Sequence, residues 1–512
     1  MLDINNLDFE DKKTWELLKS GNTSGVFQLE TDLGKTWVKQ IGPNSLTDLS
    51  AILALLRPAC LNTGMTLKYC KIQNGDEPPL RFNHNLVDSI LAPTNGVLIY
   101  QEQLMKFGGE IAWRDMPYLE RLVIVDKLRK GIGKKDSALI GELKSKFIDG
   151  CERNGEETDL ATDLFSMIES AGRYAFNDAH AKKYALYSFQ TAYLKAHHPY
   201  EFYTVYMTYS KAKPKPRLEL QGLINEAKML NVNVLPPDIT RQNDEFRICW
   251  HNNKRAIAFG LGHIKNVGRS DVKLIEGEVI DTWAKLFKAH FDTTRKTRLR
   301  RPSMESLITS GACDAFGVGR KRLMNMFNCC RELSAKEIKY VMGELKDDLT
   351  PQQFKTLIIK CADEVSMKKR KGLVRSEAQV MLDEEQDSFT WRAKCEEGLL
   401  GIALTCSPVD DKQIRAAKTC KECYHTSNNN RNMRASVAVV INEIIPMVTK
   451  KGKAPGSPMA QLIVSDSTGE VKVAVFPDTY KNTKEHLHKG LTYTMDLNGT
   501  GTGWCVHRLS II

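Results

Sequence analysis

Polar and small apolar residues recur with the period of an α-helix along residues 175 to 199. At about 100° per residue, the polar positions share one narrow face and the apolar positions share the opposite one. The polar face holds His180, Lys183, Tyr187 and Gln190, and the apolar face holds Ala181, Ala185, Phe189, Ala192 and Ala196. The pattern predicts a helix that begins at Asn177 or Asp178 and whose small buried residues let another element approach closely.

The polar face of this helix offers an imidazole, an ammonium group, a phenol ring and an amide. Such a set suits a triphosphate and a stacked base. An ordinary amphipathic surface helix, with a polar face that is only solvated, explains the same pattern, and the pattern alone leaves both interpretations open.

Along the rest of the chain, the spacing of apolar residues changes from a helical to a strand-like period near residue 400. Helical stretches dominate before it, and the first of them stops at Ser20 and Gly21. From residue 435, apolar positions alternate and are interrupted by a turn at 466–469, which predicts a small closed β-barrel of the OB type. The expected fold is therefore multidomain and mainly α, followed by a C-terminal β-barrel.

Composition narrows the class of protein. A chain of 512 residues with 42% apolar residues suggests roughly three domains with proper cores. Its 73 basic and 62 acidic residues give a net charge of +11, which favours a polyanionic partner. The 13 cysteines, an odd number without regular spacing, fit a reducing compartment. No apolar run is long enough to span a membrane and the first residues are acidic, so we expect a cytoplasmic protein.

The amino-acid sequences of several segments closely resemble the fingers of the C-family bacterial replicative DNA polymerases, the alpha subunit of DNA polymerase III. The central match is formed by Phe176, Asn177, His180, Tyr184, Ala185, Leu186, Gln190, Thr191, Leu194, Lys195, Ala196, Pro199, Glu201 and Phe202. Further matches are Arg57, Pro58, Leu61, Gly64 and Met65, and then Gly96, Tyr100, Gln101, Glu102, Gln103 and Met105. The chain departs from the family at Ala59 and Cys60 and, more importantly, at Asp178, where the family has a lysine that could contact phosphate.

A basic cluster at residues 126–135 contains two glycines, which would let the backbone come close to an anion. Basic clusters are usually solvated faces, but the resemblance implies that this one lines the nucleotide site. The implied nucleotide-binding residues are Arg129, Lys130, Lys134, Lys135, His180, Lys183, Tyr187 and Gln190.

Two glycine-containing stretches, 257–275 and 311–324, look like helix-hairpin-helix elements that hold duplex DNA by its backbone. A single Gly-x-Gly is ordinarily a tight turn, but two of them in a polymerase-like order favour DNA binding. The candidates are Lys265, Asn266, Gly268, Gly317, Gly319, Arg320, Lys321 and Arg322. In the barrel, Lys450, Lys451, Lys453 and Phe476 are candidate contacts to single-stranded nucleic acid, although Phe476 could equally be a core residue.

Two weaker patterns leave their alternatives open. The resemblance places a sliding-clamp peptide near residues 379–382, but the expected aromatic residue is absent and the buried stripe of a helix explains Val380 and Leu382 equally well. Cys420, Cys423 and His425 have the spacing of half a zinc site without a second half, so we assign no metal ligand in this chain.

The chain contains no Asp-x-Asp pair, whereas two-metal nucleotidyl transfer needs close carboxylates. The resemblance begins after the family's palm, so we expect fingers at 1–210, a helix-hairpin-helix region at 211–395 and an OB-fold at 396–512. It implies one half of a split polymerase of phage origin that binds dNTP and template-primer DNA while a palm-bearing polypeptide holds Mg²⁺. A sliding clamp is a further candidate partner. The alternatives are a non-catalytic DNA-binding accessory protein and, less favoured, a nuclease or ligase-type factor.

Overall fold

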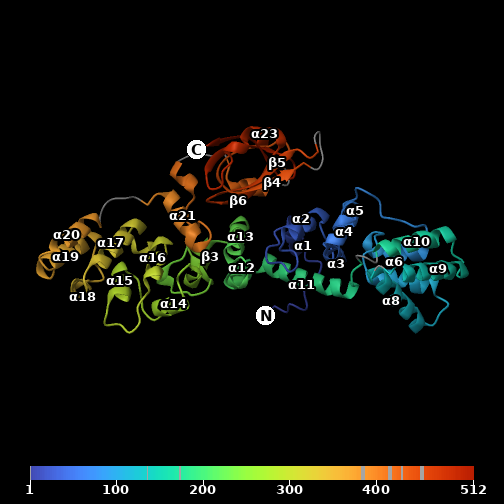
Figure 1. Cartoon of the computed structure of the whole chain (residues 1–512), viewed down its shortest axis with the longest axis horizontal. Coiled ribbons are helices and arrows are strands. Elements are labelled where there is room, and N and C mark those ends of the chain that lie inside the picture. Colours follow the sequence, from blue (N-terminus) through green and yellow to red (C-terminus); the bar gives the residue numbers. More distant parts are fainter. Residues whose placement is uncertain are drawn as a thin grey trace. The chain divides into compact units, whose positions relative to one another are not determined.

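The computed structural model describes residues 2–134, 136–171, 175–381, 387–412, 418–427, 430–449 and 455–512. The chain forms two compact units, Met1–Pro199 and Tyr200–Ile512 (Figure 1). The fingers-like segment expected at 1–210 thus extends past the end of the first unit, and the two other expected segments lie together in the second.

The first unit is built from helices, drawn in blue to green in Figure 1. Asp11 caps the first helix by accepting a hydrogen bond from the Thr14 N–H, and Gly21 ends it in the left-handed conformation at φ 77°, which confirms the predicted stop. The helices are α1 (Lys12–Ser20), α2 (Asp32–Ile41), α3 (Leu46–Leu55), α4 (Pro58–Asn62), α5 (Met65–Gln73), α6 (Asn85–Leu91), α7 (Gln101–Lys106), the π-helix η2 (Phe107–Ala112), α8 (Tyr118–Lys134), α9 (Ser137–Arg153), α10 (Thr158–Ala171) and α11 (Asp178–His197).

Helix α11 buries the small apolar face that the sequence predicts. Ala185, Phe189 and Ala192 lie in one core cluster with Trp15 and Leu18 of α1. The indole ring of Trp15 packs 4.9 Å from the Phe189 ring, measured between centroids. The helix therefore packs against α1 through this face, while His180, Lys183 and Tyr187 of the polar face are exposed.

The second unit begins with helices around a small sheet. Its helices are α12 (Pro199–Tyr209), α13 (Pro216–Met229), α14 (Arg269–Glu276), α15 (Trp283–Phe291), α16 (Arg301–Thr309), α17 (Arg320–Glu332), α18 (Ala335–Glu344), α19 (Pro351–Glu364), α20 (Lys371–Val380), α21 (Phe389–Leu400) and α22 (Cys420–Thr426). The sheet has the order β1-β3-β2, with β1 (Val234–Leu235), β2 (Arg247–His251) and β3 (Lys254–Ala258). Asn252 and Asn253 join β2 to β3 with positive φ values of 48° and 58°, as a two-residue hairpin turn requires.

The C-terminal strands close into a barrel of order β4-β5-β6-β8-β7, which confirms the expected fold class. Its elements are β4 (Arg434–Val448), β5 (Pro458–Asp466), β6 (Gly469–Val475), α23 (Pro477–Thr483), β7 (Thr492–Gly499) and β8 (Trp504–Ile511). The predicted turn between β5 and β6 is present, because Asp466 Oδ1 accepts hydrogen bonds from the N–H groups of Thr468 and Gly469 at 2.8 and 3.2 Å. Alternate residues of β6 are buried, as a barrel wall requires.

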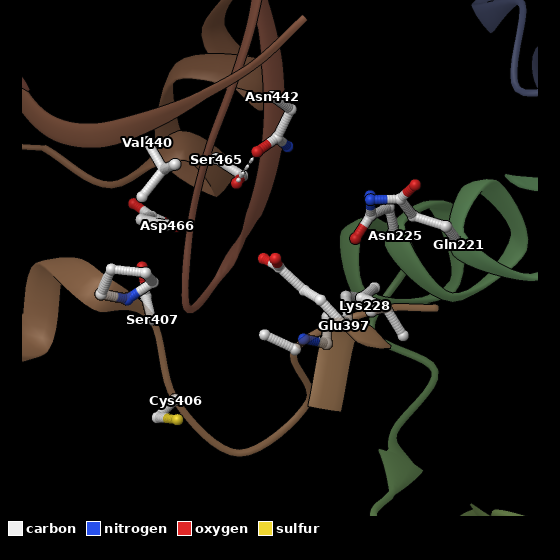
Figure 2. Close-up of a pocket in the computed structure, with 13 residues that line it drawn as sticks. Gln221, Asn225, Lys228, Glu397, Cys406, Ser407, Val440, Asn442, Ser465 and Asp466 are labelled. Atoms are coloured by element: carbon white, nitrogen blue, oxygen red, sulfur yellow. Dashed lines mark hydrogen bonds between the residues drawn. The ribbon is translucent and has the colours of Figure 1, made fainter. Parts of the chain in front are cut away.

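A small polar cavity lies where α13 and the end of α21 meet strands β4 and β5 (Figure 2). Lys228, Glu397, Asn442 and Ser465 are among the residues that line it, and Ser465 donates a hydrogen bond of 3.1 Å to Asn442 Oδ1. Burial raises the pKa of the Glu397 carboxyl and lowers the pKa of the Lys228 ammonium. The volume, about 40 Å³, suits a few water molecules and is far too small for a nucleotide.

Candidate nucleotide and DNA interfaces

The start of α11 is tied to the start of α7 by backbone hydrogen bonds. Phe176 donates to the Ile99 carbonyl at 2.9 Å, and its own carbonyl accepts from Gln101 at 2.8 Å. Asn177 caps the helix, because its side-chain oxygen accepts a 2.8 Å hydrogen bond from the His180 N–H. This confirms one of the two capping residues that the sequence left open, and it fixes the position of His180.

Aromatic rings follow one another along the exposed side of α11. The rings of His180 and Tyr184 lie 4.0 Å apart, and Phe27 lies 5.1 Å from Tyr184 and 5.9 Å from Tyr187. The Lys183 ammonium lies 6.0 Å from the Tyr187 ring centroid. His180, Lys183 and Tyr187 are exposed, so three of the four predicted side chains share one accessible face.

The fourth predicted residue, Gln190, has an internal partner. Its Nε2 donates a 2.9 Å hydrogen bond to the Ile4 carbonyl, and its side chain is half-buried. The matched Lys195 is also internal, because it is buried and its Nζ donates to the Ser24 carbonyl at 2.7 Å. The structure thus gives both residues a role in holding the N-terminal segment onto α11.

Two carboxylates stand at the N-terminus of α11, where the family resemblance expects a lysine. Glu102 accepts hydrogen bonds from the Asn177 side chain at 2.6 Å and from the Asp178 N–H at 2.8 Å. Asp178 in turn holds the Lys182 ammonium at 2.8 Å. These negative charges oppose the attraction that a helix N-terminus has for an anion, so Lys183 is the better placed candidate for phosphate.

The basic cluster at 126–135 differs from the expected backbone site. Through Lys134 it is the last part of helix α8, so the predicted approach of the Gly131 backbone to an anion is wrong: helical N–H groups are bonded four residues back. A Cβ on Gly131 would lie 3.1 Å from Leu139, so the glycine instead permits close packing of α8 and α9. Lys130 is exposed and paired with Asp126 at 2.6 Å. The side chains of Arg129 and Lys134, and the whole of Lys135, lie outside the described residues.

The loop before α14 presents the first predicted DNA-binding element. Lys265, Asn266 and Arg269 are exposed, and Asn266 adopts the left-handed conformation at φ 69° that asparagine tolerates. A Cβ on Gly268, the residue before the helix, would lie 3.0 Å from the Arg300 guanidinium. The loop therefore places basic side chains in solvent beside a helix start.

The buried Asp271 holds this loop in place. Its carboxylate accepts hydrogen bonds from the Gly268 N–H at 3.0 Å and from Ser303 Oγ at 2.8 Å, and it pairs with Arg300 at 2.5 Å. Burial by itself would raise the pKa of Asp271, but the hydrogen bonds, above all from Arg300, outweigh it and hold the pKa below its usual range.

The start of α17, the second predicted element, is satisfied from within the chain. The Asp387 carboxylate accepts hydrogen bonds from the backbone N–H groups of Arg320 and Lys321 at 2.7 and 3.0 Å. The Arg320 guanidinium is buried between Asp314 at 2.7 Å and Glu396 at 2.8 Å. The structure thus gives Arg320 an internal role, while Lys321 and Arg322 are half-buried and Gly317 and Gly319 shape the turn.

The remaining predicted sites are the nucleic-acid contacts of the barrel and the cysteine pair, and only some of them lie within the described residues. Phe476 is 44% exposed at the start of α23, so it is not a core residue, whereas Lys450, Lys451 and Lys453 lie outside the described residues. Cys420 and Cys423 lie in the barrel core, where burial raises the pKa of both thiols. Among the described residues, no three His, Cys, Asp or Glu side chains gather as a metal ion would need.

The region of the predicted clamp peptide is partly helical. Val380 at the end of α20 is 54% exposed, so the alternative that it belongs to a buried stripe is wrong, and Met381 beside it is 1% exposed and lies in the core. Leu382 lies outside the described residues. Across the described part of the chain, no helix is both long and apolar enough to cross a membrane.

Sequence reasoning missed two kinds of residue. Asp387, which accepts the Arg320 N–H, and Glu396, which pairs with its guanidinium, lie far along the chain from Arg320, so no local pattern signals them. Trp250 does have a local signal in the sequence, because the segment Trp-His-Asn-Asn-Lys places an aromatic residue beside a hairpin turn and a cation. In the structure Trp250 is 74% exposed.

Comparison with known families matches residues 1–155 to the bacterial DNA polymerase III alpha subunit finger domain and residues 231–323 to a helix-hairpin-helix motif. The chain belongs to the DNA polymerase III alpha family. It is 30% identical to the DNA polymerase III subunit alpha of Buchnera aphidicola (from Schizaphis graminum) over 496 residues, 93% of this chain and 39% of that protein.

Other relatives of this family match over a similar span. The subunit of Escherichia coli K12 is 29% identical over 95% of this chain and 40% of its own length, and that of Aquifex aeolicus is 31% identical over 95% and 38%. The chain therefore spans about two fifths of the length of these curated relatives. Helix α11 lies beyond the residues matched to the finger domain, although its sequence carries the longest of the polymerase-like motifs described above.

Proposed function

We propose that this chain supplies the dNTP-handling and DNA-gripping part of a replicative DNA-directed DNA polymerase. The observation that carries the proposal is the exposed face of α11, where His180, Lys183 and Tyr187 lie in the first half of a helix whose start is tied to α7. Membership in a family whose relatives are named DNA polymerase III subunit alpha supports it. In this proposal the rings of the α11 face contact the base or sugar of the nucleotide and Lys183 contacts its phosphates.

The DNA-gripping part of the proposal rests on the loop before α14. Exposed Lys265 and Arg269 flank a helix start within the matched helix-hairpin-helix motif, a setting suited to template-primer phosphates. The residues that the structure describes do not gather a carboxylate set for magnesium, so the metal-binding carboxylates would come from outside them. The split enzyme, in which a separate palm-bearing polypeptide supplies them, is one form of this proposal.

A primer-extension assay tests this form. This chain, the palm-bearing polypeptide and their mixture are incubated with magnesium, four dNTPs and a primed template. We expect synthesis only in the mixture. Lys183→Ala should raise the apparent KM for dNTP about ten-fold, because it removes a charge-assisted phosphate contact, and should leave template-primer affinity unchanged.

The matched control is Lys146→Ala, which removes another exposed ammonium group of the first unit, one that pairs with Glu142. Its KM should equal that of the unmodified chain. An equal rise for both variants would remove Lys183 from the nucleotide site, and loss of template-primer affinity in Lys183→Ala would make it a DNA contact.

A second candidate function is a DNA-binding accessory protein without synthesis. The acidic pair Glu102 and Asp178 at the start of α11 favours it, because these carboxylates repel a triphosphate. If the mixture shows no primer extension although both chains are folded and this chain still binds DNA, the result would favour this function.

A further inference from the structure

The β2–β3 hairpin carries an exposed tryptophan close to its tip. Trp250 is 74% exposed, whereas Ile257, two positions further from the tip on the same face, is fully buried in the core. In the antiparallel register Trp250 stands directly opposite Arg255, and Ile248 stands opposite Ile257. Because cross-strand partners share a face of the hairpin, that face runs from the protein core into solvent, where it ends in an indole ring.

The hairpin that carries Trp250 is anchored to α12. The Arg255 guanidinium lies 4.9 Å above the Tyr200 ring and pairs with Glu201 at 2.5 Å, so it joins the hairpin to α12. The two-residue turn of Asn252 and Asn253 fixes the strand register. The strand that carries Trp250 is therefore fixed in place, so stacking on the ring costs little ordering of the backbone.

The charges around the hairpin tip favour a polyanion. Arg247 and Lys254 are exposed on its two strands, on the face opposite Trp250, and the Arg247 guanidinium also donates to the Arg241 carbonyl at 3.1 Å. The nearby carboxylates have cationic partners: Glu245 holds Lys211 at 3.4 Å and the His263 ring at 2.5 Å, and Glu201 holds Arg255. An exposed aromatic ring on a hairpin whose other face is basic can combine base stacking with attraction of the backbone phosphates, the two interactions by which proteins bind single-stranded nucleic acid.

The hairpin also leads directly to the first DNA-binding element. Strand β3 runs from Lys254 to Ala258, and Gly260 follows before the loop that precedes α14. At about 3.3 Å per residue, the five steps from Arg255 to Gly260 cover up to roughly 17 Å, a span of a few nucleotides. The hairpin and the loop before α14 are therefore parts of one continuous segment of the second unit.

We propose that Trp250 stacks on an unpaired base of single-stranded DNA that extends from the duplex held beside α14. The proposal rests on the proposed function only in that this chain binds duplex DNA. It assigns base stacking to Trp250, and longer-range attraction of the DNA backbone to Arg247 and Lys254 on the other face of the hairpin.

Fluorescence anisotropy of the full chain tests it with two probes: a blunt duplex, and the same duplex with a ten-nucleotide 5′ thymidine overhang. Trp250→Ala should weaken binding of the overhang probe about ten-fold, since stacking of a base on an aromatic ring contributes that order of affinity. Trp250→Phe should keep most of it, and all variants should bind the blunt duplex alike. Val279→Ala is the control, because Val279 is 67% exposed in the same unit and has no aromatic ring.

The outcomes separate the two proposals. Absence of binding to either probe by the unmodified chain would contradict the DNA-binding part of the proposed function. Binding of both probes with no effect of Trp250→Ala would overturn only the stacking role. Equal losses on both probes would make Trp250 a duplex contact or a structural residue, and this result would overturn the inference.

Discussion

The helix starts of α14 and α17 look alike in sequence and differ in structure. Both follow a glycine-containing turn and carry basic residues in their first turn. At α14, Lys265 and Arg269 are exposed, and the buried Asp271 holds the loop from the inside. At α17, Asp387 already accepts the N–H groups of Arg320 and Lys321.

This difference indicates which of the two basic helix starts has backbone N–H groups already occupied by a carboxylate of the chain. A carboxylate that accepts two backbone N–H groups takes the place that a DNA phosphate would take. We therefore propose that the phosphate contact lies at α14 and that the start of α17 has a structural role. Substitutions at the two starts can break or sharpen this comparison.

The largest expected effect is on folding. Arg320→Ala leaves the fully buried Glu396 without its cation, so we expect a loss of about 3–5 kcal/mol in the free energy of unfolding of the second unit. Chemical denaturation followed by circular dichroism measures it. A stable variant with weakened DNA binding would contradict the structural role of Arg320.

A smaller loss is expected for Asp271→Asn, about 2 kcal/mol near neutral pH, because its hydrogen bonds to Arg300 lose their charge. The folded-state pKa of Asp271 lies below that of an unfolded aspartate, about 3.9. Its contribution is therefore fully present above about pH 4 and is lost as the pH falls through the folded pKa.

Urea unfolding at several pH values measures this contribution. The difference in stability between the unmodified chain and Asp271→Asn should be constant near neutral pH and shrink below about pH 4. A difference that grows as the pH falls would show that the folded pKa is raised instead.

The substitution Asp387→Ala should have opposite effects on stability and binding. It removes the carboxylate that caps α17, at a cost of about 1–2 kcal/mol in stability. It also frees two N–H groups beside Lys321 and Arg322, so duplex affinity should rise a few-fold. Asp363→Ala, which removes an exposed carboxylate of the same unit, is the control in an anisotropy assay. Equal gains in both variants would indicate a general charge effect.

The sequence predicts the features whose causes are local. The buried and exposed faces of α11 follow from a helical period over twenty residues, and the barrel from alternating strands and the turn at Asp466. The role of Arg320 does not follow in this way, because Asp387 lies 67 residues away and Glu396 lies 76 residues away. The role of Gly131 was predicted wrongly for a related reason. A glycine is needed there because α9 packs closely on it, and the residues next to it in the sequence do not reveal that packing.

The most direct test of the comparison is the salt dependence of duplex DNA binding, measured by anisotropy between 50 and 200 mM salt. The double variant Lys265→Ala/Arg269→Ala should lower the slope of log affinity against log salt by about two, since each phosphate contact contributes about 0.9. The double variant Lys321→Ala/Arg322→Ala should leave the slope nearly unchanged. A slope that falls only in the second variant would place the DNA at α17 and contradict the account.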